Sequence, residues 1–112
     1  MQHEMNVAAV PFEKICNGSK IIESRLFDEK RQAIRLGDEI LFHQADDTTN
    51  VVKMKVVDLL RYSSFEQLFA SHNPEIFGGT SVTELLREIK QFYSDEDEEK
   101  YGVVGIRLQK ID

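Results

Sequence analysis

Three ionisable residues near the start of the chain have the types and spacing of a binding site for a phosphate or a nucleobase. Lys20, Glu23 and Arg25 follow closely on one another after a glycine. A lysine ammonium is a compact charge with three donors, and an arginine guanidinium is a planar fork that suits phosphate oxygens or a base edge. A glutamate beside them could orient the arginine or accept a hydrogen bond from a base amine. We therefore expect these three residues to bind a ligand.

The backbone conformation decides whether the three side chains meet. Alternation over residues 20–26 predicts a strand, on which Glu23 and Arg25 share one face. Strict alternation puts Lys20 on the other face, so it joins the site only from the entrance of the strand, before alternation begins. The alternative is a solvated lysine and a structural ion pair, since lysine is rarely buried.

Two aromatic residues bracket an expected strand–helix junction. Tyr62 and Phe65 stand on either side of two serines. Aromatic side chains at such a place can stack on a base, although core packing is the commoner use. We assign Phe65 to the core and keep Tyr62 as a ligand-binding candidate.

Other reactive residues show no metal, cofactor or nucleophile pattern. His3, His43 and His72 lie far apart in the sequence, without metal-ligand spacing. Cys16 lies on the apolar side of a predicted helix and is expected to be a small core residue. The acidic run 95–99 is expected to be solvated and exposed. We therefore expect neither a metal nor a cofactor.

Hydrophobic periodicity predicts an α+β chain of short strands with frequent turns. Strands are expected at 6–10, 20–26, 39–43, 51–62 and 101–111. Helices are expected at 11–17, 64–71 and 81–91, the last two behind capping boxes. Loops or turns are expected at 27–35, 44–50, 73–80 and 94–100. This order favours a small mixed or antiparallel β-barrel with flanking helices.

Composition favours one small folded domain over residues 1–112. The chain is 41% hydrophobic and 30% charged, which suits a single modest core. It has no apolar run near the ~20 residues that span a bilayer and no signal-peptide pattern, so we expect a cytoplasmic protein without a membrane partner. The net charge of −6 argues against non-specific coating of DNA, but it leaves room for a local basic cleft.

Four segments in order resemble the ASCH (activating signal cointegrator homology) family. Its opening pattern, a short helix and then Gly-x-Lys-x-x-Glu-x-Arg, is filled by Gly18, Lys20, Glu23 and Arg25. The other three segments are a Gly-Asp turn into a strand, a strand-to-helix passage and a closing strand, at 34–42, 56–68 and 101–106. The resemblance covers nearly the whole chain.

This resemblance implies a PUA-like β-barrel, a fold whose members bind RNA or modified bases. The family's proposed ligand site is a cleft between the barrel and its flanking helices. The resemblance thus implies RNA or a nucleotide as the partner, with Lys20, Glu23, Arg25 and Tyr62 as the binding residues.

Two further functions stay open. Some small bacterial proteins similar to this family are amidohydrolases that act on acylated nucleosides such as N4-acetylcytidine, through a lysine, a threonine three residues later and a later glutamate. Lys20 fits the lysine, but Glu23 stands at the threonine position, and neither Glu75 nor Glu84 aligns cleanly with the glutamate. In a hydrolase, Lys20 and Glu23 would be the catalytic pair, with Glu23 steering a water. The third alternative is a module whose acidic surface binds a basic protein partner.

Overall fold

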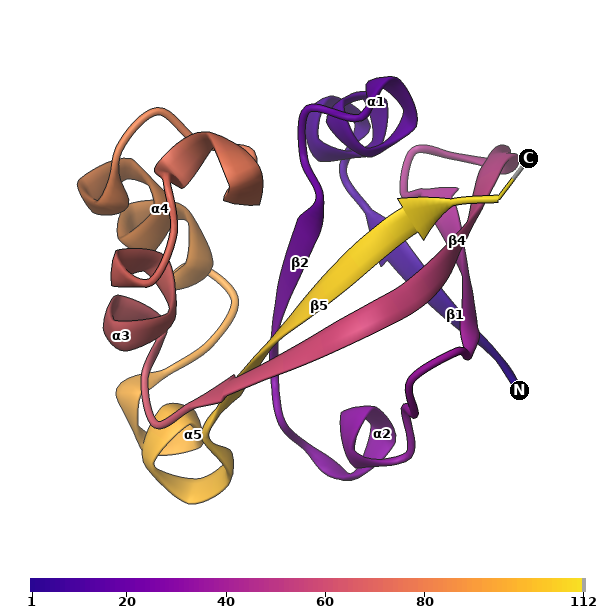
Figure 1. Ribbon diagram of the computed structural model, residues 1–112. Coiled ribbons are helices and arrows are strands. Elements are labelled where there is room, and N and C mark those ends of the chain that lie inside the picture. Colours follow the sequence, from indigo (N-terminus) through magenta and orange to yellow (C-terminus); the bar gives the residue numbers. More distant parts are fainter. Residues whose placement is uncertain (112) are drawn as a thin grey trace.

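A curled five-stranded sheet with helices beside it forms the structure, a computed structural model that describes residues 1–111 (Figure 1). The strands are β1 (Gln2–Val7), β2 (Ile22–Leu26), β3 (Glu39–Gln44), β4 (Asp47–Tyr62) and β5 (Val103–Lys110). The helices are α1 (Ala9–Asn17), α2 (Glu29–Gln32), α3 (Phe65–Ala70), α4 (Val82–Ile89) and α5 (Asp95–Tyr101), with a 3-10 turn at Pro74–Phe77. None of the helices within residues 1–111 is both long and apolar enough to cross a membrane.

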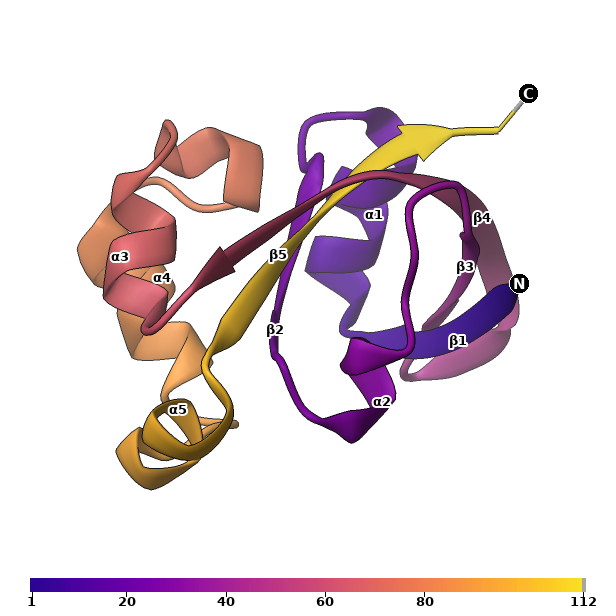
Figure 2. The same cartoon turned by 60° about the horizontal axis from the view of Figure 1, so that its bottom comes forward.

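The sheet is mixed, and its order is β1-β3-β4-β5-β2. β1 and β3 are parallel, whereas the other neighbouring pairs are antiparallel. The sheet curls into a half-barrel whose two edge strands are β1 and β2 (Figure 2). This architecture confirms the predicted α+β class with a small mixed barrel and flanking helices.

Two hydrophobic cores share strand β5. Val104, Ile106 and Leu108 point into the barrel core, as their alternation predicts. Val103 points the other way, into a second core between the sheet and α3 and α4. In Figure 1 these helices and α5 lie together on one side, beside β2 and β5, while α1 and α2 lie at opposite ends of β2. β2 therefore separates the barrel from the helical layer.

The first helix begins earlier than predicted. Residues 8–10 were expected to be extended because they precede Pro11, but α1 begins at Ala9 and β1 ends at Val7. Pro11 then lies in the first turn of the helix, where a backbone N–H has no helical acceptor, so the missing donor costs nothing.

Two charged stretches that were expected to be loops are helical. Asp28 caps α2, because its side chain accepts from the backbone N of Arg31. Ser94 and Asp97 form a capping box at the start of α5, whose acidic first turn favours the positive end of the helix dipole. Glu98 is 7% exposed and accepts a hydrogen bond from the backbone N of Phe65 at 2.8 Å, so the acidic run is partly structural.

The polar segment 44–50 is mostly strand. β3 and β4 pair up to Gln44 and Asp47, which leaves Ala45 and Asp46 as the hairpin turn. The side chains at 47–51 are exposed, so this end of the hairpin extends past the core and shows no apolar alternation.

Gly105 lies where β5 packs closely against α3 and β2. A Cβ atom there would lie 2.9 Å from Leu68 Cδ1 and 3.0 Å from Ile22 Cγ2. We predict that Gly105→Ala lowers the free energy of unfolding by about 1–3 kcal/mol, because overpacking forces both neighbours to move. Urea denaturation measures the loss, with the exposed Gln109→Ala on the same strand as control. Equal stability of the two variants would contradict this packing.

Candidate functional site

The structure brings Lys20, Glu23 and Arg25 together around a buried carboxylate. Glu23 is 4% exposed, and both of its oxygens are engaged. Lys20 Nζ lies 2.7 Å from Oε1, and Arg25 donates to Oε2 from Nε at 2.9 Å and from Nη2 at 2.7 Å. We call these three residues the charged triad. Their contact confirms that they lie side by side, while their role in binding a ligand stays a prediction.

Lys20 reaches the triad from the entrance of the strand. Gly18 ends α1 in the left-handed region, with φ at 84°, and β2 begins only at Ile22. Lys20 therefore precedes the alternation that would have turned it away from Glu23. Its aliphatic stem packs against Gly78, where a Cβ atom would lie 2.9 Å from Lys20 Cδ. The absence of a side chain at Gly78 thus makes room for the lysine.

Arg25 joins three parts of the fold. Its Nη2 also donates to the carbonyl oxygen of Asn6 at 2.9 Å, so it reaches from edge strand β2 to edge strand β1. Tyr93, which follows α4, lies close enough to interact with the same guanidinium. Ile22 and Leu26, on the other face of β2, pack into the core of the helical layer. The triad consequently lies along the open edge of the barrel, where it meets the helices.

The triad holds its charges firmly. Burial would raise the pKa of Glu23, but the charges and hydrogen bonds of Lys20 and Arg25 outweigh it and lower that pKa to about 2. Burial would lower the pKa of Arg25, yet Glu23 and then Tyr93 raise it above its ordinary value. With two cations around one carboxylate, the triad keeps a net positive charge.

A cleft of about 530 Å³ adjoins the triad through Arg25. We call it the seam cleft, because it lies beside the gap between β1 and β2. Its polar lining is Glu4, Asn6, Arg25, Lys30, Arg31, His43 and Thr48. A second cleft, of about 480 Å³, lies beside α5. Its lining has four carboxylates against the single cation of Lys90: Glu66, Asp95, Glu98 and Glu99. An anionic ligand is repelled by the second cleft and suits the first.

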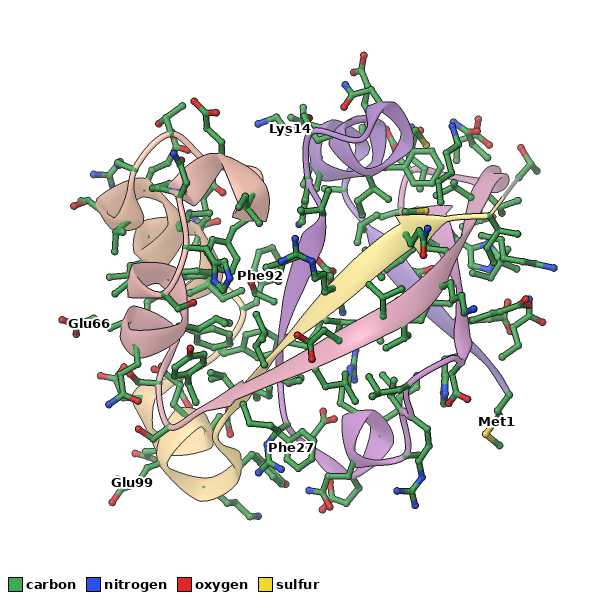
Figure 3. All side chains as sticks on the ribbon, viewed as in Figure 1. Met1, Lys14, Phe27, Glu66, Phe92 and Glu99 are labelled. Atoms are coloured by element: carbon green, nitrogen blue, oxygen red, sulfur yellow. The ribbon has the colours of Figure 1, made fainter. Side chains whose placement is uncertain are left out.

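The aromatic neighbours of the triad differ from those predicted. Phe65 is fully buried, as expected. Tyr62 ends β4 opposite Val103 and packs against the helical-layer core, and no ion pair or hydrogen bond within residues 1–111 links it to the triad. Tyr93, in the connection from α4 to α5, interacts with Arg25, and Phe92 precedes it in that connection. Phe92 is 73% exposed, and Figure 3 shows it on the side of the helical layer that faces the sheet. The adjacent aromatic pair after the predicted helix was the signal that could have drawn attention to them.

The two later carboxylates, Glu75 and Glu84, differ in their surroundings. Glu84 accepts from the backbone N and the hydroxyl of Thr80, at 3.0 and 2.9 Å. Glu75 is exposed in the 3-10 turn. In the part of the chain that the structure describes, neither is hydrogen-bonded or ion-paired to Lys20.

The histidines have individual partners. His3 lies 2.8 Å from Asp38, His43 lies 2.8 Å from Glu4, and His72 lies 2.8 Å from the hydroxyl of its neighbour Ser71. Among residues 1–111, no group of three or more histidine, cysteine or acidic side chains could hold a metal ion. Cys16 is partly buried against the barrel core, in agreement with its predicted packing role.

The sequence matches a known protein family over almost its whole length. The model of the ASCH domain matches residues 5–112. The chain belongs to the ASCH domain family. Two solved structures are similar over its length: the hypothetical protein PH0355 (38% identity, TM-score 0.87, 99% of this chain and 100% of that one) and protein PF0455 from Pyrococcus furiosus (33%, 0.79, 100% and 99%). No curated protein matches the sequence.

A more distant ASCH structure shares the fold alone. The ASCH protein from Zymomonas mobilis is 11% identical, with a TM-score of 0.61 over 97% of this chain and 67% of that one. The family model confirms the ASCH part of the functional prediction, and RNA binding stays a prediction. The ligand, its cleft and the hydrolase alternative stay predictions.

The lowered pKa of Glu23 predicts a pH-dependent contribution to stability. Its carboxylate titrates at 4.5 when unfolded and at about 2 when folded, so the contribution is complete above pH 4.5 and is lost as the pH falls through 2. At about 1.4 kcal/mol per pKa unit, the loss is about 3 kcal/mol. Denaturant unfolding of the wild type should show this loss, and Glu23→Gln should lack it.

Subtracting the pH dependence of stability of Glu23→Gln from that of the wild type isolates the contribution of Glu23 from those of the other carboxylates. Asp38, for example, also has its pKa lowered to about 2, chiefly by a hydrogen bond with His3, but it is present in both. The same dependence of stability on pH in wild type and Glu23→Gln would mean that the triad is not held together as described.

Proposed function

We propose that this ASCH domain binds single-stranded RNA or a nucleotide at the charged triad. Lys20 and Arg25 would contact phosphate oxygens or the acceptors of a base edge, while Glu23 would fix their positions and accept from a base amine. The observation that carries the proposal is a buried carboxylate shared by two cations at the open edge of the half-barrel.

A purely structural explanation accounts poorly for this arrangement. Burying charges is expensive, and replacing a buried ion pair by packed apolar residues is often neutral or stabilising. The triad nevertheless places three charges at one edge strand, with a net positive charge in a chain whose net charge is −6. Perturbed ionisable groups beside a cleft are typical of binding and catalytic sites.

Phe92 supplies the apolar surface that a base would need. It is exposed although large and apolar, and it directly precedes Tyr93, which contacts Arg25. A base stacked on Phe92 would lie beside the residue next to Tyr93, which contacts Arg25, and stacking of this kind tolerates any base. This arrangement suits an unpaired nucleotide better than a duplex, whose bases are stacked on one another.

The hydrolase alternative gains no support from the geometry. A general base works best with a pKa near the working pH, whereas Glu23, at about 2, is a weak base. No hydroxyl stands at position 23, and within residues 1–111 neither Glu75 nor Glu84 is hydrogen-bonded or ion-paired to Lys20. We therefore place binding above hydrolysis.

The binding proposal predicts where a short oligonucleotide perturbs the protein. Titration of the ¹⁵N-labelled chain with hexauridylate should shift amide signals around Lys20, Arg25 and Phe92, with an affinity that falls as salt rises. Phe92→Ala, at an exposed position, should weaken binding by about 1–3 kcal/mol and leave the fold intact. The triple change Lys20→Ala, Glu23→Gln, Arg25→Ala should abolish binding without leaving a buried charge unpaired.

Lys53→Ala with Lys55→Ala is the matched control, because it removes two exposed cations from β4. Shifts that map to Lys53 and Lys55 and survive the triple change would refute the proposal. Release of acetate from N4-acetylcytidine that disappears in Lys20→Ala would instead support the hydrolase.

A further inference from the structure

The seam cleft has the lining of a site for an anion. Arg25, Lys30 and Arg31 bring three cations to it from β2 and α2, and His43 adds an imidazole from β3. Glu4 is the one carboxylate among its lining residues, and that carboxylate is engaged by His43 Nε2 at 2.8 Å. The lining is thus positive in a protein that is acidic as a whole.

Arg31 and Lys30 each have hydrogen-bond donors without a partner in the described part of the chain. Arg31 Nε is buried and has no hydrogen-bond partner in the described part of the chain. The guanidinium of Arg31 reaches Asp28 only through Nη1, at 3.4 Å. The side chain of Lys30 is exposed, with neither an ion pair nor a hydrogen bond to another residue in the range 1–111. A buried donor without a partner is costly, and an acceptor-rich ligand would satisfy it.

His43 strengthens the positive field of the cleft. Its hydrogen bond with Glu4 and, next, its contact with the carbonyl oxygen of Thr48 raise its pKa above the ordinary value, against the opposing effect of burial. A charged His43 cancels Glu4, which leaves the arginines and Lys30 without an opposing carboxylate in the lining.

The charged triad and the seam cleft meet at Arg25. Its guanidinium binds Glu23 on the triad side and the carbonyl oxygen of Asn6 at the cleft wall. A nucleotide held at the triad would therefore have its next phosphate within reach of the cleft. The cleft volume of about 530 Å³ is ample for a phosphate with part of its sugar.

We propose that the seam cleft is a phosphate subsite, which holds a phosphodiester of the RNA strand between Arg25, Lys30 and Arg31. The planar forks of the two arginines suit phosphate oxygens, and Lys30 adds a point charge at the rim. This subsite rests on the proposed function, because the triad supplies the neighbouring nucleotide position, but the phosphate chemistry can be tested separately.

Three probes separate the subsite from the triad. The ¹⁵N-labelled protein is titrated at low ionic strength with uridine, uridine 5′-monophosphate and inorganic phosphate. Both phosphate-bearing probes should shift the amide signals of Lys30, Arg31 and His43, and uridine should not. Lys30→Ala should weaken binding of hexauridylate and reduce the slope of log affinity against log salt by about 0.7, as for one phosphate contact on a single strand.

Lys55→Ala, which removes an exposed lysine from β4, is the control and should leave the slope unchanged. Equal effects of Lys30→Ala and Lys55→Ala, or phosphate titrations that leave the cleft signals in place, would overturn the subsite. Hexauridylate shifts at the triad with none in the cleft would overturn the subsite alone. Phosphate shifts in the cleft without any response of the triad to hexauridylate would support the subsite and refute the proposed function.

Discussion

The carboxylate of Glu23 is the point on which the arrangement of the candidate site depends. It lies on an edge strand that has the barrel on one face and the helices on the other, and each of its oxygens is bound by a different cation. Lys20 ties it to the segment that leaves α1, and Arg25 ties it to β1. Removing either cation would leave a buried charge poorly compensated, so the three side chains must be ordered together. This coupling also protects the edges of the sheet, because Arg25 occupies a backbone acceptor that another strand could otherwise use.

Acidic and basic side chains gather on different parts of the protein and have different roles. Asp97 completes the capping box of α5, and Glu98 binds the first N–H of α3 while it pairs with Lys90. The cations of β2 and α2 line the seam cleft. A net charge of −6 thus limits attraction to nucleic acid in general, and the seam cleft is a local exception with a positive lining, at which we propose that a short strand binds. Weak, local binding is the behaviour expected of such a surface.

Much of the fold follows from residue patterns, and much of the site does not. The alternation in β4 and β5 and the serine caps of α3 and α4 correctly predicted those elements, because each pattern acts over a few residues. α2 and α5 were missed because they bury little apolar surface and depend on caps, and the buried role of Glu98 depends on a tertiary contact. Glu23 and Arg25 were paired by their spacing alone. By contrast, Asn6 and Tyr93 reach Arg25 through the curl of the sheet and the packing of a loop, which no local pattern records.

The central claim, that Lys20 and Arg25 present ligand-binding donors around Glu23, is tested most directly by side-chain nitrogen NMR. The Nζ signal of Lys20 and the Nε signal of Arg25 should be slow to exchange in the free protein, because both groups are held by a buried carboxylate. Addition of uridine 5′-monophosphate should shift both signals along one saturating curve. Rapidly exchanging signals in the free protein, or signals that stay in place while those of Lys53 and Lys55 move, would contradict the account.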